Sequence, residues 1–72
     1  MAEQKEIKIT TRDRILRAWE NSMEMVRDFE NYSHEIEDAP EVAELFSEFA
    51  KEVGIHASKL RQLMHQYSNS KN

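Results

Sequence analysis

The apolar residues between positions 11 and 37 repeat with the spacing of an amphipathic helix. Thr10 stands directly before this segment and Asp13 follows three residues later, a pattern typical of a capping box at a helix N-terminus. Beyond it the apolar spacing alternates between four and three residues, as in a heptad repeat. The members of this repeat, the first seam, are Ile15, Trp19, Ser22, Val26, Phe29, Ser33 and Ile36. The pattern predicts a continuous helix over about residues 11–37.

A second heptad repeat predicts another helix over about residues 39–67. The break between the two is short: Asp38 is the expected N-cap, Pro40 fits the first turn, and Glu41 completes a capping box. So short a connection places the helices antiparallel. Gly54 indicates either close backbone approach or a tolerated surface glycine. The members of this repeat, the second seam, are Val42, Phe46, Phe49, Val53, His56, Leu60, Leu63 and Tyr67.

Two helices alone cannot cover both of these apolar seams. The 72 residues are enough for one small domain, expected to span 1–72 with flexible ends at 1–9 and 68–72. With no cysteine, disulfides cannot supplement its small core. We therefore expect an all-α antiparallel hairpin that forms a homo-oligomer, as a dimeric four-helix bundle. The residues expected in its core or dimer contact are Trp19, Val26, Phe29, Phe46, Phe49, Val53, Leu60 and Leu63.

Charge is distributed unevenly along the predicted hairpin. Residues 28–52, around the turn, hold nine acidic residues and one base, Lys51, whereas the remaining residues hold nine bases and five acids. Two hairpins would attract each other if the turn of one lay beside the open end of the other. The net charge of −4 argues against a nucleic-acid partner. Without an apolar run of about 18 residues or a signal-like N-terminus, we expect a soluble cytoplasmic protein with no membrane partner.

His56 is the candidate for site chemistry, because it falls on the second seam. In an antiparallel hairpin it lies level with Ser22 and close to Glu20. It could be a buried histidine bonded to Ser22, to the backbone or to water. It could instead bind iron, manganese or zinc together with Glu20 and the same pair from a second chain. A third possibility is a surface pair with Glu52, four residues earlier on the same helix face.

The stretch with Phe46, Ala50, Val53, His56 and Ala57 resembles the second helix of a ferritin-like, rubrerythrin-type half-bundle. That family has Phe, then Ala four residues on, a ligand Glu seven on and a ligand His ten on, followed by Ala. The register of its bridging glutamate is occupied by Glu20. The resemblance implies that two copies rebuild a ferritin-like four-helix bundle with Glu20 and His56 as metal ligands. Because Val53 replaces the ligand glutamate, the resemblance predicts iron at reduced ligation, or none.

Three functions are compatible with these patterns. The first is a non-enzymatic, ferritin-like hairpin that self-associates in a structural or interaction role. The second is a metal-binding redox or iron-handling protein of the di-iron type that uses Glu20 and His56. The third is an adaptor that binds a partner's amphipathic helix through Met23, Met25 and Met64. The two seams, the short connection, the uneven charge and the missing ligand glutamate favour the first. No nucleophile set, phosphate-binding loop or redox thiol pair is present in the sequence.

Overall fold

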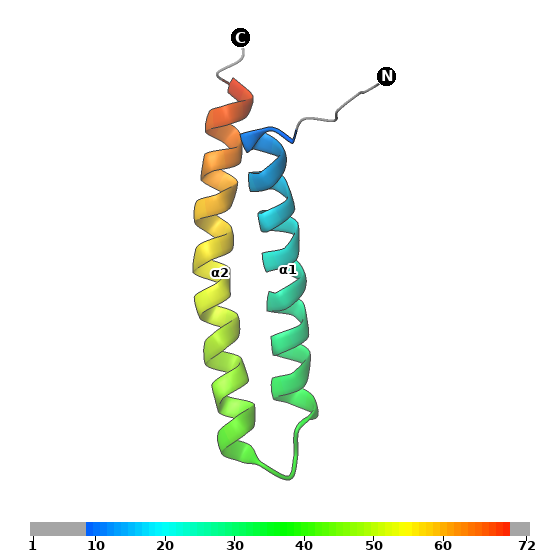
Figure 1. Cartoon of the computed structure of the whole chain (residues 1–72). Coiled ribbons are helices and arrows are strands. Elements are labelled where there is room, and N and C mark those ends of the chain that lie inside the picture. The colour runs from blue at the N-terminus through cyan, green and yellow to red at the C-terminus, as the bar shows by residue number, and fades with distance from the viewer. Residues whose placement is uncertain (1–8, 70–72) are drawn as a thin grey trace, which may run out of the picture.

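The computed structural model describes residues 9–69, and this part of the chain forms two α-helices. Helix α1 spans Thr11–Glu35 and helix α2 spans Pro40–Asn69. The helices run antiparallel, so the turn lies at one end of the molecule and both termini at the other (Figure 1). This arrangement confirms the predicted helical hairpin. Of the two ends predicted to be flexible, residues 68 and 69 are helical, while 1–8 and 70–72 lie outside the described residues.

The N-terminus of α1 has the predicted capping box. The Oγ1 atom of Thr10 accepts a hydrogen bond from the Asp13 amide at 3.1 Å, and Asp13 Oδ2 accepts one from the Thr10 amide at 3.2 Å. The hydrogen bond from the Thr10 amide is the main reason why the pKa of Asp13 is lowered from its ordinary value of 3.8. At the other end, the Ile36 amide donates to the Tyr32 carbonyl at 3.0 Å and closes the last turn.

Helix α2 begins one residue later than a cap at Asp38 requires. Its first residue is Pro40, which lies in the first turn as predicted, so the preceding Ala39 occupies the cap position. The carbonyl of Ala39 accepts hydrogen bonds from the amides of Val42 at 3.0 Å and Ala43 at 3.1 Å. The expectation of an Asp38 cap is therefore wrong by one residue, because the backbone turns into the helix only at the proline.

The first seam faces α2 as predicted. Ile15 is buried, and the other six members are all partly buried. The alternation of four and three residues keeps them on one side of α1. The spacing alone therefore identified these seven buried or partly buried residues, although Leu16 and Ala18 beside them are partly buried as well.

The residues of the second seam lie on two sides of α2, whereas the sequence predicted that they share one side. Phe46, Val53 and Leu60 are partly buried, whereas Val42, Phe49, His56, Leu63 and Tyr67 are exposed. The centre of the contact is formed by Ala50 and Ala57, each only 3% exposed. Alanines let the helix backbones approach closely, so α2 turns this line of residues toward α1. The full set facing α1 is Ala43, Phe46, Ala50, Val53, Ala57, Leu60 and Met64.

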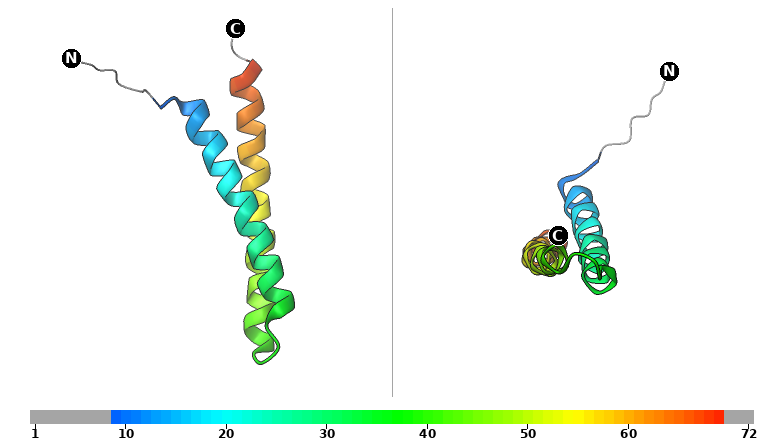
Figure 2. Two further views of the ribbon diagram at one scale, coloured as in Figure 1. Left: turned by 90° about the vertical axis from the view of Figure 1, so that its right-hand side faces the viewer. Right: turned by 90° about the horizontal axis from the view of Figure 1, so that it is seen from below.

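Four aromatic rings join the helices in the half of the hairpin nearer the turn. The ring centroids of Phe29 and Phe46 lie 5.4 Å apart, and those of Tyr32 and Phe46 lie 5.3 Å apart. Phe49 completes the group at 6.2 Å from Phe29 and 6.1 Å from Phe46. These distances are favourable for tilted and edge-to-face contacts. The helices cross and diverge toward the termini (Figure 2), so the aromatic group holds them together on the turn side.

The acid dependence of helix α1 should report on Asp13. A carboxylate whose pKa is lower in the folded state stabilises that state above its unfolded pKa, and this contribution is lost as the pH falls through the folded pKa. An acid titration of helical circular dichroism should therefore show a component that Asp13→Asn removes. Identical titration curves for the two proteins would contradict the role of the capping box.

Two substitutions on neighbouring turns of α2 should have opposite effects on the free energy of unfolding. A Cβ atom at Gly54 would meet nothing within 4 Å, so Gly54→Ala should stabilise the hairpin by about 1 kcal/mol. Ala57 is 3% exposed, so Ala57→Leu should destabilise it by about 1–3 kcal/mol through overpacking. Thermal and urea denaturation measure both changes.

The matched control for these two variants is Ser58→Ala, an exposed position on the same turn. It should change the free energy of unfolding by less than about 0.5 kcal/mol. If Ala57→Leu changed the free energy of unfolding as little as this control does, the alanines would not set the distance between the helices.

Candidate interaction surface

One side of the hairpin carries a row of large apolar side chains. Val42, Phe49 and Leu63 each precede by one residue a member of α2 that faces α1, so they lie about 100° around the helix from it. On α1, Met25 and Tyr32 likewise each precede by one residue a member of the first seam. Because the helices are antiparallel, both rows point to the same side. We call this surface the apolar face; its members are Met25, Tyr32, Val42, Leu45, Phe49, Leu63 and Tyr67.

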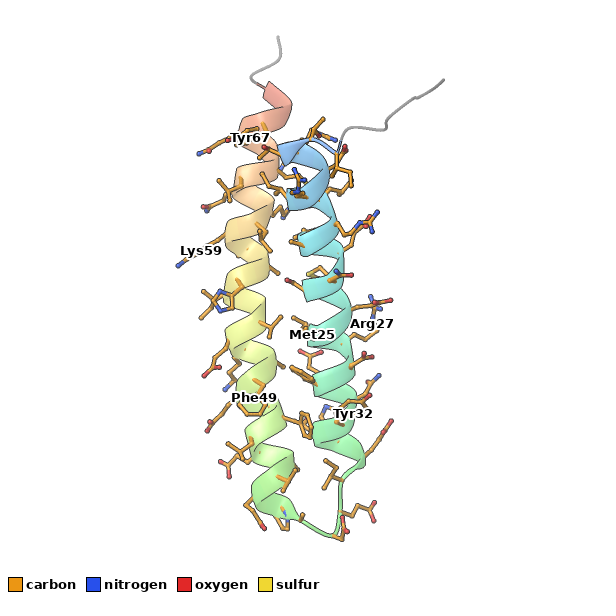
Figure 3. The ribbon with its side chains drawn as sticks, in the orientation of Figure 1. Met25, Arg27, Tyr32, Phe49, Lys59 and Tyr67 are labelled. Atoms are coloured by element: carbon orange, nitrogen blue, oxygen red, sulfur yellow. The ribbon has the colours of Figure 1, made fainter. Side chains whose placement is uncertain are left out.

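Figure 3 shows the apolar face toward the viewer. Met25, Tyr32 and Phe49 gather along the line between the helices, whereas Arg27 points away from α2 and Lys59 away from α1. Every member of the face keeps more than a third of its surface exposed. Contiguous exposed apolar side chains of this kind mark interaction sites on soluble proteins.

The hairpin has almost no interior of its own. In the part of the chain that the structure describes, the only buried hydrophobic residues are Ile15, Ala50 and Ala57, and no large side chain is fully buried. Domains this small usually need a partner or another stabilising element. The apolar face is a surface on which a partner could supply the missing burial.

Two open hollows lie elsewhere on the hairpin. An open hollow of about 340 Å³ is lined by Trp19, Met23, Gly54, Ala57, Ser58 and Arg61. Gly54 therefore borders open space and does not mark close approach to α1. A second open hollow, of about 550 Å³, lies on α1 and is lined by Trp19, Glu20, Asn21, Met23, Glu24 and Arg27. Neither encloses a volume from which water is excluded.

The two predicted metal ligands point in different directions within one chain. His56 is exposed and directly precedes the buried Ala57, so it lies in line with Phe49 on the apolar face. Glu20 is exposed and stands two residues, or about 200°, before Ser22, whose side faces α2. His56 is therefore not the buried partner of Ser22 that its place on the second seam suggested. A metal site formed by two chains stays a prediction.

No group of three or more His, Cys, Asp or Glu side chains among the described residues is arranged to hold a metal ion. The third possibility for His56, a surface pair, agrees with its exposure and with that of Glu52 on the same side of α2. Together with Lys59, which is exposed one heptad after Glu52, these two polar residues interrupt the apolar face along α2.

The sequence contains a signal for the division of the second seam. Alanine recurs every seven residues at Ala43, Ala50 and Ala57, and each is preceded by a position of the second seam. Two heptad repeats offset by one residue give a helix that is apolar on two adjacent sides. Such a helix packs against one neighbour through the small residues and leaves the other side available for a second.

Neither helix within residues 9–69 combines the length and apolar character that crossing a membrane requires. Comparison of the chain with protein-family models, with curated proteins and with solved structures finds no match. The resemblance to the ferritin-like family stays a prediction.

Proposed function

We propose that this protein is a structural or interaction module that acts as a self-associated oligomer. Two hairpins pack their apolar faces together into a four-helix bundle. The observation that carries this proposal is the exposed apolar face on a hairpin that buries only three hydrophobic residues within 9–69. Removing seven large side chains from water supplies the hydrophobic stabilisation that the single hairpin lacks.

The shape of the apolar face favours a second hairpin over a single partner helix. Met25 and Tyr32 come from α1, and the other members come from α2, so the face is two helices wide. A lone amphipathic helix lying in the groove between them would leave the outer members, such as Leu45, uncovered. A second copy presents a surface of the same width and length, and an isologous contact closes on itself.

Charge favours an antiparallel arrangement of the two copies. The acidic residues of 28–52 surround the turn, whereas Arg12, Arg14, Arg17, Lys59 and Arg61 lie in the half with the termini. Placing the turn of one hairpin beside the termini of the other brings opposite charges together at both ends of the bundle. The parallel arrangement would bring the two acidic ends together.

Introducing a charge into the apolar face should dissociate the oligomer. Phe49→Glu places a carboxylate in the proposed contact and should raise the dissociation constant at least about 30-fold. Sedimentation equilibrium over a range of protein concentrations, with light scattering for mass, measures this change.

The matched control is Ile55→Glu, which alters a residue of α2 that is 58% exposed but lies outside the apolar face. It should leave the dissociation constant within about threefold of the parent. A parent chain that is a folded monomer at every concentration would overturn the proposal. Equal dissociation by both variants would show that the apolar face is not the contact.

A further inference from the structure

The side of α2 that belongs to the apolar face also carries an acid, a histidine and a base. Glu52, His56 and Lys59 are exposed, and each directly precedes a residue that faces α1. Phe49 and Leu63 do the same on either side of them. The complete series of positions on this side is Val42, Leu45, Phe49, Glu52, His56, Lys59, Leu63 and Gln66, with the exposed Tyr67 beside the last. Apolar residues therefore lie on both sides of a charged segment.

This series is symmetric about His56. Glu52 lies four residues before the histidine and Lys59 three residues after it, so the two charges are at nearly equal distances from it. Phe49 and Leu63 lie seven residues before and after it. If a two-fold axis passes beside His56, two antiparallel copies of α2 therefore place each residue level with one of matching character. The pairs across the contact are Glu52 with Lys59, Phe49 with Leu63, Leu45 with Gln66 and Tyr67, and His56 with its own copy.

We infer that two copies of α2 pack antiparallel about a two-fold axis at His56, and that Glu52 of each copy pairs with Lys59 of the other. This register rests on the self-association proposed above and fixes the relative position of the two copies. Glu52 and Lys59 lie about 50° further from α1 than Phe49 and His56 do, so the ion pairs form at the edge of the contact and keep access to water. The two His56 rings meet at the axis, where a neutral imidazole donates one N–H and accepts at its other nitrogen.

Neighbouring registers are less favourable for the same residues. A slide of one heptad in one direction sets Glu52 against Glu52 and Phe49 against His56. The opposite slide sets Lys59 against Lys59 and His56 against Leu63. Slides of about half a heptad set Lys59 against Phe49 or Glu52 against Leu63. Each slide loses both ion pairs and sets a polar side chain against an apolar one, and the whole-heptad slides also place like charges together.

The axis at His56 also defines a level on α1. The ring contacts of Phe29 and Tyr32 with Phe46 show that residues of α1 and α2 whose numbers sum to about 77 lie level within the hairpin. Asn21 is therefore the residue of α1 that lies level with His56. It is exposed on the side of α1 that belongs to the apolar face, so the same axis passes beside it.

The residues of α1 around this axis match each other as well. Arg14 and Asp28 are exposed and lie seven residues on either side of it, so Arg14 of one copy is level with Asp28 of the other. One nitrogen of the Arg14 guanidinium donates to the Ile9 carbonyl at 2.9 Å, and the guanidinium has further N–H groups for a carboxylate. Between these pairs, the small side chain of Ala18 lies level with the large one of Met25.

The two helices together favour this axis more clearly than either does alone. On α1, a slide of one heptad would also pair charges, because it sets Arg14 against Glu35. The hairpin links the two helices, and that slide is the one that sets Glu52 against Glu52 on α2. The axis beside Asn21 and His56 is thus the one that pairs opposite charges on both helices.

An engineered thiol at the axis tests this register, because the chain has no cysteine of its own. His56→Cys chains should form a disulfide-linked dimer under mild oxidation at least about fivefold more than Leu63→Cys or Ile55→Cys chains, since a residue on the axis lies beside its own copy. The two Leu63→Cys thiols share the side of α2 but would lie about 20 Å apart, and the Ile55→Cys thiols lie near the axis on another side. All three positions are exposed in the single hairpin, so the variants should keep its fold.

Charge reversal tests the ion pairs without relying on disulfide geometry. Glu52→Lys and Lys59→Glu, made singly, each set like charges against each other at both pairs, so each should raise the dissociation constant at least about fivefold. The two changes combined in one chain restore both pairs in the opposite sense. They should therefore return the dissociation constant to within about twofold of the parent value. Sedimentation equilibrium measures all three variants.

The matched control reverses the same charges on the opposite side of α2. Glu44 and Arg61 are exposed, and each follows, rather than precedes, a residue that faces α1. Glu44→Lys and Arg61→Glu should each leave the dissociation constant within about twofold of the parent value. Their combination should equal the sum of the single changes in free energy, because these residues lie outside the contact.

The outcomes separate the register from the self-association on which it rests. Parent chains that stay monomeric overturn both. Dimers that Phe49→Glu dissociates, but that show no excess cross-linking with His56→Cys or no recovery in the combined charge variant, retain the shared face and overturn the register. An equal recovery in the control combination would also overturn the pairing of Glu52 with Lys59.

Discussion

A hairpin of two helices has only one contact between its elements, and this constraint governs the rest of the molecule. Each helix can bury one narrow side against the other, and here the tightest part of that contact consists of Ala50 and Ala57. Small residues bring the backbones close but contribute little apolar area. The large apolar side chains beside them, such as Phe49 and Leu63, consequently remain on the surface. The proposed second copy follows from this deficit of buried area rather than from any motif.

The aromatic group near the turn and the alanine contact have different roles. Phe29 and Phe46 fill the space between the helices on the turn side, where ring contacts add to burial. Toward the termini the helices diverge, and the hollow beside Gly54 opens between them. The ring contacts are thus on the turn side, whereas Ile15 and Ala57 are buried in the half nearer the open end. In the antiparallel bundle that we propose, the turn of each copy lies beside the open end of the other.

The distribution of charge along the hairpin gives the apolar face a preferred orientation toward a second copy. An uninterrupted apolar stripe would allow one helix to slide along another by whole heptads at little cost. The separation of acidic and basic residues along the hairpin favours the antiparallel orientation of two copies. The histidine that resembles a metal ligand is exposed on the same side of α2 as Phe49. Val53, at the position of the missing ligand glutamate, is partly buried on the side that faces α1.

The sequence by itself determined the two helices, their antiparallel order, the capping box at Thr10 and Asp13, and the seam of α1 that is buried or partly buried. Heptad spacing and capping chemistry are local, so they can be read from one segment at a time. The sequence did not determine which of two adjacent sides of α2 faces α1, because residues one apart in overlapping heptads are both apolar. Only packing settled this: Ala50 and Ala57 fit against α1, and Phe49 and His56 turned outward. The tertiary structure thereby moved the candidate site from the inside of the hairpin to its surface.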